Sequence, residues 1–180
     1  MRMSLSDKKP SSRLARLGIL LCLSLAFSYL EFLLPPLLPV PGIKPGFANS
    51  VIVFCACFCG LPDALILSCV RVLLSSVLFG SVTGFLFSLS GALFSYLVLL
   101  FFIKVRFSSV SVIGISAACA AAHNMGQLCA SALVLSSSAV FSYAPVLLLG
   151  GTVMGILTGC ILYVLFSALR RAGFCALHSI

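Results

Sequence analysis

The stretch GFLFSLSGALFSYLVLLFFI, residues 84–103, is twenty residues long and contains no charged side chain. A helix rises about 1.5 Å per residue, so a run of this length crosses the roughly 30 Å hydrocarbon core of a bilayer. Its apolar residues are continuous rather than alternating, which argues against a strand of a membrane β-barrel. The stretch therefore predicts a transmembrane helix.

The rest of the chain has the same character. Of the 180 residues, 62% are hydrophobic and 8% are charged, whereas an ordinary soluble domain has about 25% charged residues. We predict an all-α fold, a polytopic membrane bundle of about six transmembrane helices in one domain. The second span is short, so five spans and a re-entrant segment are an alternative. The expected spans are 17–34, 47–61, 62–80, 84–103, 111–135 and 141–169.

The positions of the basic residues predict the orientation of the chain. With six spans, nine of the eleven lysines and arginines fall on one side, and the loops on the other side carry only Lys44. This positive-inside pattern places both termini in the cytoplasm and argues for lipid rather than nucleic acid as the partner of these charges. We expect an integral protein of the cytoplasmic (inner) membrane, with cytoplasmic tails at 1–16 and 170–180 around a transmembrane domain at 17–169. The nine residues are Arg2, Lys8, Lys9, Arg13, Arg16, Lys104, Arg106, Arg170 and Arg171.

Nine cysteines raise the question of a metal site. The densest group is Cys55, Cys57 and Cys59. Residues two apart on a helix point roughly 200° away from each other, so these three thiols cannot converge on one ion. The cysteines are better explained as small apolar residues of the membrane helices. We expect no metal ion and no cofactor.

Polar residues inside the spans are the candidates for function, because lipid-exposed charge is costly. Glu31 is the only acid and Arg71 the only base within a span, and each lies on a helix face with serines. The fifth span adds His123, Asn124 and Gln127, and Asn49 lies near the outer start of the second. Positions along the spans place these groups between the midplane and the outer surface, where they could line one outward cavity. Glu31 and Arg71 could instead form a structural ion pair, and the polar turn of the fifth span could serve interhelical hydrogen bonding.

The segment PPLLPVPGIKPGFAN, residues 35–49, connects the first two spans on the outer side. Its prolines make it stiff and unable to continue either helix, and Gly42 and Gly46 permit tight turns. It could hold Lys44 over the cavity as a lid, which would favour an anionic ligand. A plain proline-rich turn explains the segment equally well.

Small residues recur at four-residue intervals in the last span, at Gly151, Gly155 and Gly159, and in the fifth span at Ala118, Ala122, Gly126 and Ala130. Such stripes let helices approach closely. Internal packing is the simpler explanation, and docking to a separate membrane subunit is the alternative.

Four motifs resemble the Gx transporter family, which is also labelled heptaprenyl diphosphate synthase component I. They are PGIKPGFAN (41–49), RVLLSSVLFG (71–80), SLSGALFS (88–95) and AHNMGQL (122–128), in the family's order and spacing. The first matches the family pattern P-G-x-K-x-G-x-A-N. Ala92 stands where the family more often has a second glycine, which weakens the expectation of close helix approach there. The resemblance covers roughly residues 17–168.

The family is similar to the S components of energy-coupling-factor transporters. The resemblance therefore implies a six-helix protein that binds a small molecule from outside, under the loop between its first two helices. A separate ATPase and coupling module would then drive its release. It does not identify the substrate.

The enzyme label can be weighed against the residues themselves. Prenyl diphosphate synthases hold Mg²⁺ with clustered carboxylates, whereas this chain has three scattered acids, Asp7, Glu31 and Asp63, and no Walker A motif. We therefore expect no catalysis by this polypeptide and no catalytic residues.

The leading hypothesis is a membrane subunit that binds and translocates a small polar or anionic solute. The alternative is a non-catalytic membrane component of polyprenyl diphosphate synthesis, with a prenyl synthase subunit as partner, and a structural scaffold is a third possibility. The expected substrate-binding residues are Glu31, Lys44, Asn49, Arg71, His123, Asn124 and Gln127.

Overall fold

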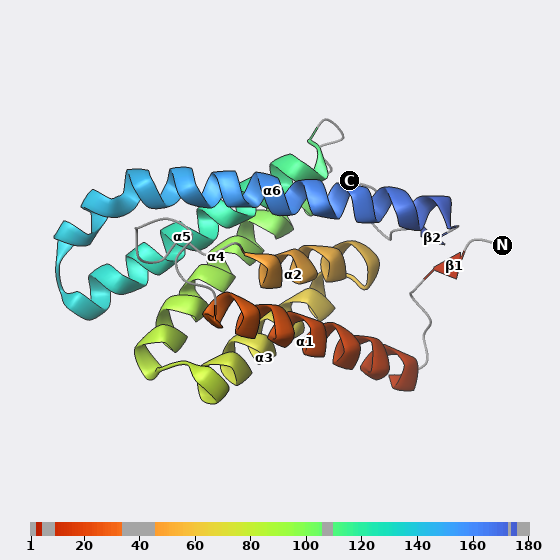
Figure 1. Ribbon diagram of the computed structural model, residues 1–180, viewed down its shortest axis with the longest axis horizontal. Helices are drawn as coiled ribbons and strands as arrows, with labels where there is room; N and C mark the ends of the chain where they lie inside the picture. The colour runs from red at the N-terminus through yellow and green to blue at the C-terminus, as the bar shows by residue number, and fades with distance from the viewer. Residues whose placement is uncertain (1–2, 5–9, 34–45, 106–109, 173, 176–180) are drawn as a thin grey trace.

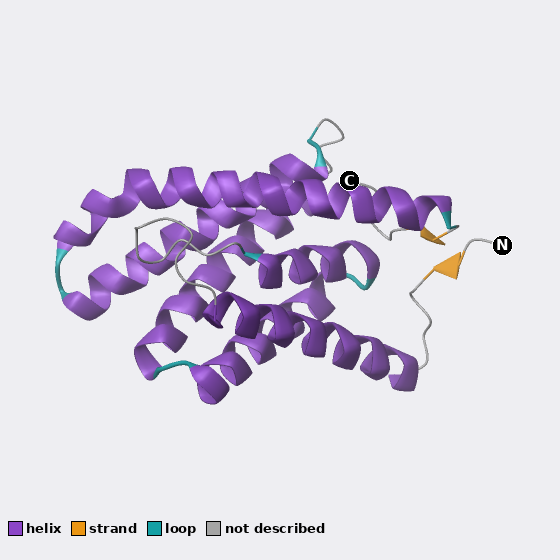
Figure 2. Ribbon diagram, viewed as in Figure 1, coloured by secondary structure: helices purple, strands orange, loops and turns teal. Residues whose placement is uncertain are grey.

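Helices account for nearly all of the chain that the computed structural model describes, namely residues 3–4, 10–33, 46–105, 110–172 and 174–175 (Figure 1). Two two-residue strands, β1 (Met3–Ser4) and β2 (Phe174–Cys175), pair in parallel, and Figure 2 shows how small a part of the fold they form. The predicted all-α bundle is confirmed. Its helices are α1 (Pro10–Leu33), α2 (Phe47–Phe58), α3 (Leu61–Phe79), α4 (Val82–Val105), α5 (Val112–Leu135) and α6 (Ala144–Arg171), with a 3₁₀ helix, η1, at Ser138–Tyr143.

Five of the described helices are long and apolar enough to cross a membrane, which makes the chain a multi-pass membrane protein. The exception is α2, whose 12 residues extend only about 18 Å. The chain nevertheless crosses back between α1 and α3, because the starts of these two helices lie together: Arg13 Nε donates to Asp63 Oδ1 at 2.9 Å. The return crossing is therefore made by α2 together with the segment before it, rather than by a full-length helix.

The helix ends follow from local sequence. α1 begins at Pro10 rather than at 17, because proline suits the first helical position and the polar residues after it favour helix even though they are not apolar. Gly60, with φ +113°, separates α2 from α3, and such a backbone is easy only for glycine. Ser111 caps α5 by accepting a hydrogen bond from the Gly114 amide at 3.2 Å. Pro145 lies in the first turn of α6, where its missing N–H costs nothing.

The short helix α2 lies at the centre of the hydrophobic core. It is apolar on every side, as expected for a helix that other helices surround. Cys55 and Cys57 have no exposed surface, so they act as small core residues. The partners of α2 in this core come from α3, α4, α5 and α6: Ala64, Leu67, Leu99, Ile103, Val112, Ile115, Cys119, Leu162 and Phe166.

Glycines allow α6 to lie directly against α5, and the two run side by side in Figure 1. A Cβ placed on Gly155 would come within 2.7 Å of Ala117 Cα, and one on Gly159 within 2.7 Å of Ile113 Cα. These contacts are with backbone atoms, which cannot move aside. The glycine stripe of α6 therefore serves internal packing, which was the simpler of the two explanations.

A second close crossing joins α4 to α5. A Cβ on Gly126 would lie 2.7 Å from the Ser90 carbonyl oxygen and 2.9 Å from Gly91 Cα. Ser90 Oγ also donates to the Gly126 carbonyl oxygen at 2.8 Å. The helices thus approach closely despite Ala92, because the crossing point is Gly91.

Candidate functional site

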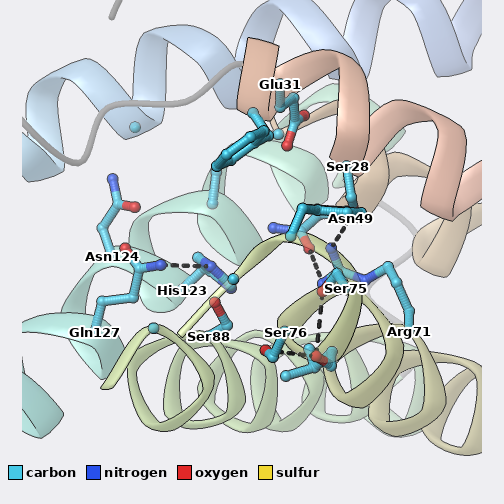
Figure 3. A pocket seen from close by; sticks show the side chains of 18 of the residues that line it. Ser28, Glu31, Asn49, Arg71, Ser75, Ser76, Ser88, His123, Asn124 and Gln127 are labelled. Carbon is cyan, nitrogen blue, oxygen red and sulfur yellow. Dashed lines mark hydrogen bonds between the residues drawn. The ribbon is translucent and has the colours of Figure 1, made fainter. Parts of the chain in front are cut away.

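One cavity of about 480 Å³ receives residues from all six helices. It lies toward the end of the bundle where α1 and α3 finish and where α2, α4 and α6 begin. Its volume is typical of a small-molecule site. Figure 3 shows the polar side chains directed into it: Ser28, Glu31, Asn49, Arg71, Ser75, Ser76, Ser88, His123, Asn124 and Gln127.

The residues expected from the sequence to form a site lie together in this wall. Six of the seven line the cavity: Glu31, Asn49, Arg71, His123, Asn124 and Gln127. Lys44 lies outside the described residues, as does most of the segment expected to act as a lid. The structure therefore brings the six into one place, and a role in binding remains a prediction.

Arg71 is the buried charge of the cavity. Only 8% of its surface is exposed, and it projects from α3 toward α1 and α2 (Figure 3). Its Nη1 donates to Ser28 Oγ at 3.3 Å, and its Nη2 donates to Asn49 Oδ1 at 3.1 Å. Its Nε is buried without a hydrogen-bond partner among the described residues. The guanidinium therefore joins three helices through neutral acceptors.

Glu31 lies near Arg71 but is not one of the hydrogen-bond or ion-pair partners that the described residues give it. Instead, Glu31 Oε1 accepts a long hydrogen bond, 3.4 Å, from the backbone N–H of Ala48 in the first turn of α2. A carboxylate at this position satisfies an end group of the helix and suits the positive end of its dipole. A direct Glu31–Arg71 ion pair is therefore wrong as an account of these two residues.

The polar turn of α5 is held as a chain of side chains. His123 Nε2 and Gln127 Nε2 are 3.2 Å apart, and Ser131 Oγ donates to the Gln127 carbonyl oxygen at 2.8 Å. On its other side the His123 ring lies against Gly91, where a Cβ would come within 2.8 Å of Cε1. A glycine of α4 thus makes room for the imidazole.

Asn124 has a structural task besides lining the cavity. Its Nδ2 donates to the Leu147 carbonyl oxygen of α6 at 2.7 Å, and the side chain lies against Gly151. A buried amide in this position ties α5 to α6. Of the three polar residues on this turn, Asn124 is therefore the one whose hydrogen bond holds the helices together.

The sequence did not single out several groups that line the cavity. Ser76 Oγ and Ser75 Oγ both donate to the Val72 carbonyl oxygen, at 2.8 and 3.1 Å. Two phenylalanines, Phe32 and Phe79, also line the wall, with ring centroids 5.5 Å apart. The serines follow Arg71 by about one turn, so helical spacing could have indicated them, whereas nothing distinguishes these phenylalanines from others in the chain.

Groups that could hold a metal ion would need at least three His, Cys, Asp or Glu side chains together. Within the described residues no such group occurs. The wall instead offers a guanidinium, a carboxylate, amides, an imidazole and hydroxyls, which suit hydrogen bonding to a polar molecule.

Comparison with known proteins gives one finding. The sequence profile of a family described as heptaprenyl diphosphate synthase component I matches residues 20–165, which is most of the chain and contains all six residues named above. Neither the curated proteins nor the solved structures compared with the chain give a match. The resemblance seen in the motifs is thereby confirmed, and the chain belongs to the heptaprenyl diphosphate synthase component I family.

Proposed function

We propose that this chain is the substrate-binding and translocating subunit of a small-molecule transporter, similar in role to the S components of energy-coupling-factor transporters. It takes up a small polar or anionic solute from outside, and a separate ATPase and coupling module supplies the energy. The observation that carries this proposal is the polar cavity of about 480 Å³ inside a bundle of membrane helices. A helix bundle that only held a scaffold together would have little use for a hollow lined by a buried arginine.

The cavity would open to the outside if the termini are cytoplasmic. Apart from Arg71, the described basic residues lie at the start of α1, the end of α4 and the end of α6: Arg13, Arg16, Lys104, Arg170 and Arg171. The positive-inside rule assigns those ends to the cytoplasm. The cavity lies toward the opposite end of α1, α3 and α6.

This orientation predicts a labelling pattern. A short epitope tag at either terminus should react with antibody only after intact cells are permeabilised, whereas a tag inserted at position 44 should react without permeabilisation. Labelling of the Arg171 end in intact cells would reverse the orientation and contradict uptake from outside.

The alternative function is a non-catalytic membrane subunit of a heptaprenyl diphosphate synthase. The description of the family favours it, and a prenyl synthase subunit would then be the partner.

Purification from native membranes separates the two functions. The full chain is isolated in mild detergent, and mass spectrometry identifies small molecules and proteins that accompany it. Transport predicts a bound water-soluble molecule and an ATPase-containing module. Co-purification of a prenyl synthase subunit, with no water-soluble molecule bound, would replace the transport proposal by the alternative.

A further inference from the structure

The two sides of the cavity differ in chemistry. The described charged groups in its wall, Glu31 and Arg71, come from α1 and α3. The polar groups on the α5 and α6 side are an imidazole, two amides and a hydroxyl, at His123, Asn124, Gln127 and Thr158. A molecule that fills the cavity would therefore meet charge at one end and hydrogen-bonding groups at the other.

The charged side is positive where α2 begins. The N-cap of α2 is Gly46, with φ +77° and no side-chain hydrogen bond to cap the helix. Uncapped N–H groups carry the positive end of the helix dipole, roughly half an elementary charge. Asn49 in the first turn of α2 accepts from Arg71, so the guanidinium lies against the same positive end.

A guanidinium beside a helix N-terminus attracts an anion more strongly than either alone. Arg71 has only neutral direct partners among the described residues, and its buried Nε has none. Removing a charge from water is costly unless an opposite charge or good hydrogen bonds replace the water. Glu31 supplies part of the compensation, since its carboxylate bonds to Ala48 at the same helix end. The arrangement suits an oxyanion that adds to these contacts.

The other side suits a neutral hydrogen-bonding group. The bond of Asn124 to Leu147 commits its amide to α6. Gln127 is hydrogen-bonded to His123 through Nε2, and an amide has more donor and acceptor capacity than this bond uses. Gln127 is therefore the side chain of this turn best placed to bond a ligand.

We infer that the cavity binds a solute with two poles: an oxyanion, carboxylate or phosphate, at Arg71 and the N-terminus of α2, and a neutral hydrogen-bonding group at His123 and Gln127. This inference rests on the proposed function and adds to it the chemical class and the orientation of the solute. The diphosphate of a prenyl lipid would share the first pole, but its apolar tail would leave the amide of Gln127 without a partner. The geometry thus favours a water-soluble molecule.

The test compares the molecules that accompany four forms of the full chain through purification. They are the parent, Arg71→Gln, Gln127→Ala and, as a matched control, Arg171→Gln, which removes an exposed arginine at the end of α6. Small molecules released on denaturation are identified by mass spectrometry, and the compound enriched with the parent is added back to measure its affinity. Arg71→Lys is included in case Arg71→Gln does not fold.

The expected compound carries a carboxylate or phosphate and a separate neutral polar group. Arg71→Gln should weaken its binding about 10- to 100-fold and Gln127→Ala up to about 10-fold, in line with hydrogen bonds to charged and to neutral groups. Arg71→Lys should bind it more weakly than the parent because lysine lacks the planar fork, and Arg171→Gln should bind it normally.

Other outcomes overturn the inference in different ways. A bound compound without an oxyanion, or one held equally well by Arg71→Gln, would contradict the two-pole assignment and leave the transport proposal standing. An oxyanion with a long apolar tail would contradict the second pole and support the prenyl synthase alternative. If the parent carries no enriched compound, the proposed function and the inference both fail.

Discussion

Gly126→Leu should destabilise the protein more than any other single change considered, by more than the roughly 1–3 kcal/mol typical of overpacking a core. A Cβ at this position already lies 2.7 Å from the Ser90 carbonyl oxygen and 2.9 Å from Gly91 Cα. Both are backbone atoms of α4, so α4 and α5 must move apart to admit a side chain. Thermal unfolding of the detergent-solubilised chain, followed by circular dichroism, measures the loss.

The matched control is Gly18→Leu, on α1. Nothing lies within 4 Å of a Cβ at Gly18, and leucine forms helix better than glycine by roughly 0.5–1 kcal/mol. This variant should therefore be as stable as the parent or slightly more stable. If the two leucine variants unfold at the same temperature, the close crossing of α4 and α5 is not what stabilises this part of the bundle.

Asn49→Leu should give the second large effect, a loss of about 1.5–3 kcal/mol, which is the usual contribution of a hydrogen bond to a charged group. The change removes the oxygen that Arg71 Nη2 reaches at 3.1 Å and leaves a buried guanidinium with fewer partners. Replacing both residues, as Asn49→Leu with Arg71→Met, should recover part of the stability, because breaking one partner of a buried polar pair is worse than removing both. The same unfolding measurement applies.

Glu31→Gln serves as the control for this prediction. If Arg71 depends mainly on Asn49 and Ser28, the loss from Glu31→Gln should be smaller than the loss from Asn49→Leu. An equal or larger loss, together with an additive double variant, would show that Glu31 is the main partner of Arg71 after all.

These predictions connect the site to the packing of the bundle. The α4–α5 crossing at Gly91 and Gly126 also holds His123 at the cavity wall, so a side chain at Gly126 should disturb the site as well as the fold. Arg71 joins α1, α2 and α3 at the opposite wall. Ligand binding and stability are therefore expected to change together in variants of either wall.

The sequence by itself determined the class of fold. Twenty uncharged residues at 84–103 and similar runs elsewhere can be stable only in lipid, where a helix satisfies its own backbone. Helical spacing also grouped Ser28 with Glu31, and His123 with Gln127, because residues three or four apart share a helix face. Approximate depth then placed these groups at similar levels, and the structure has them in one cavity.

Only the tertiary structure decided which faces meet. Periodicity gives the residues on one face of a helix but not the rotation of that helix against its neighbours. For this reason the sequence left open whether Arg71 met Glu31, whereas the structure pairs it with Ser28 and Asn49. The bond from Asn124 to the Leu147 carbonyl oxygen was equally invisible, since a backbone acceptor on another helix leaves no trace in the sequence. The half-length of α2 and its central position also depend on packing: an apolar run has the same composition whether lipid or protein surrounds it, and only the surrounding helices show that α2 is buried among them.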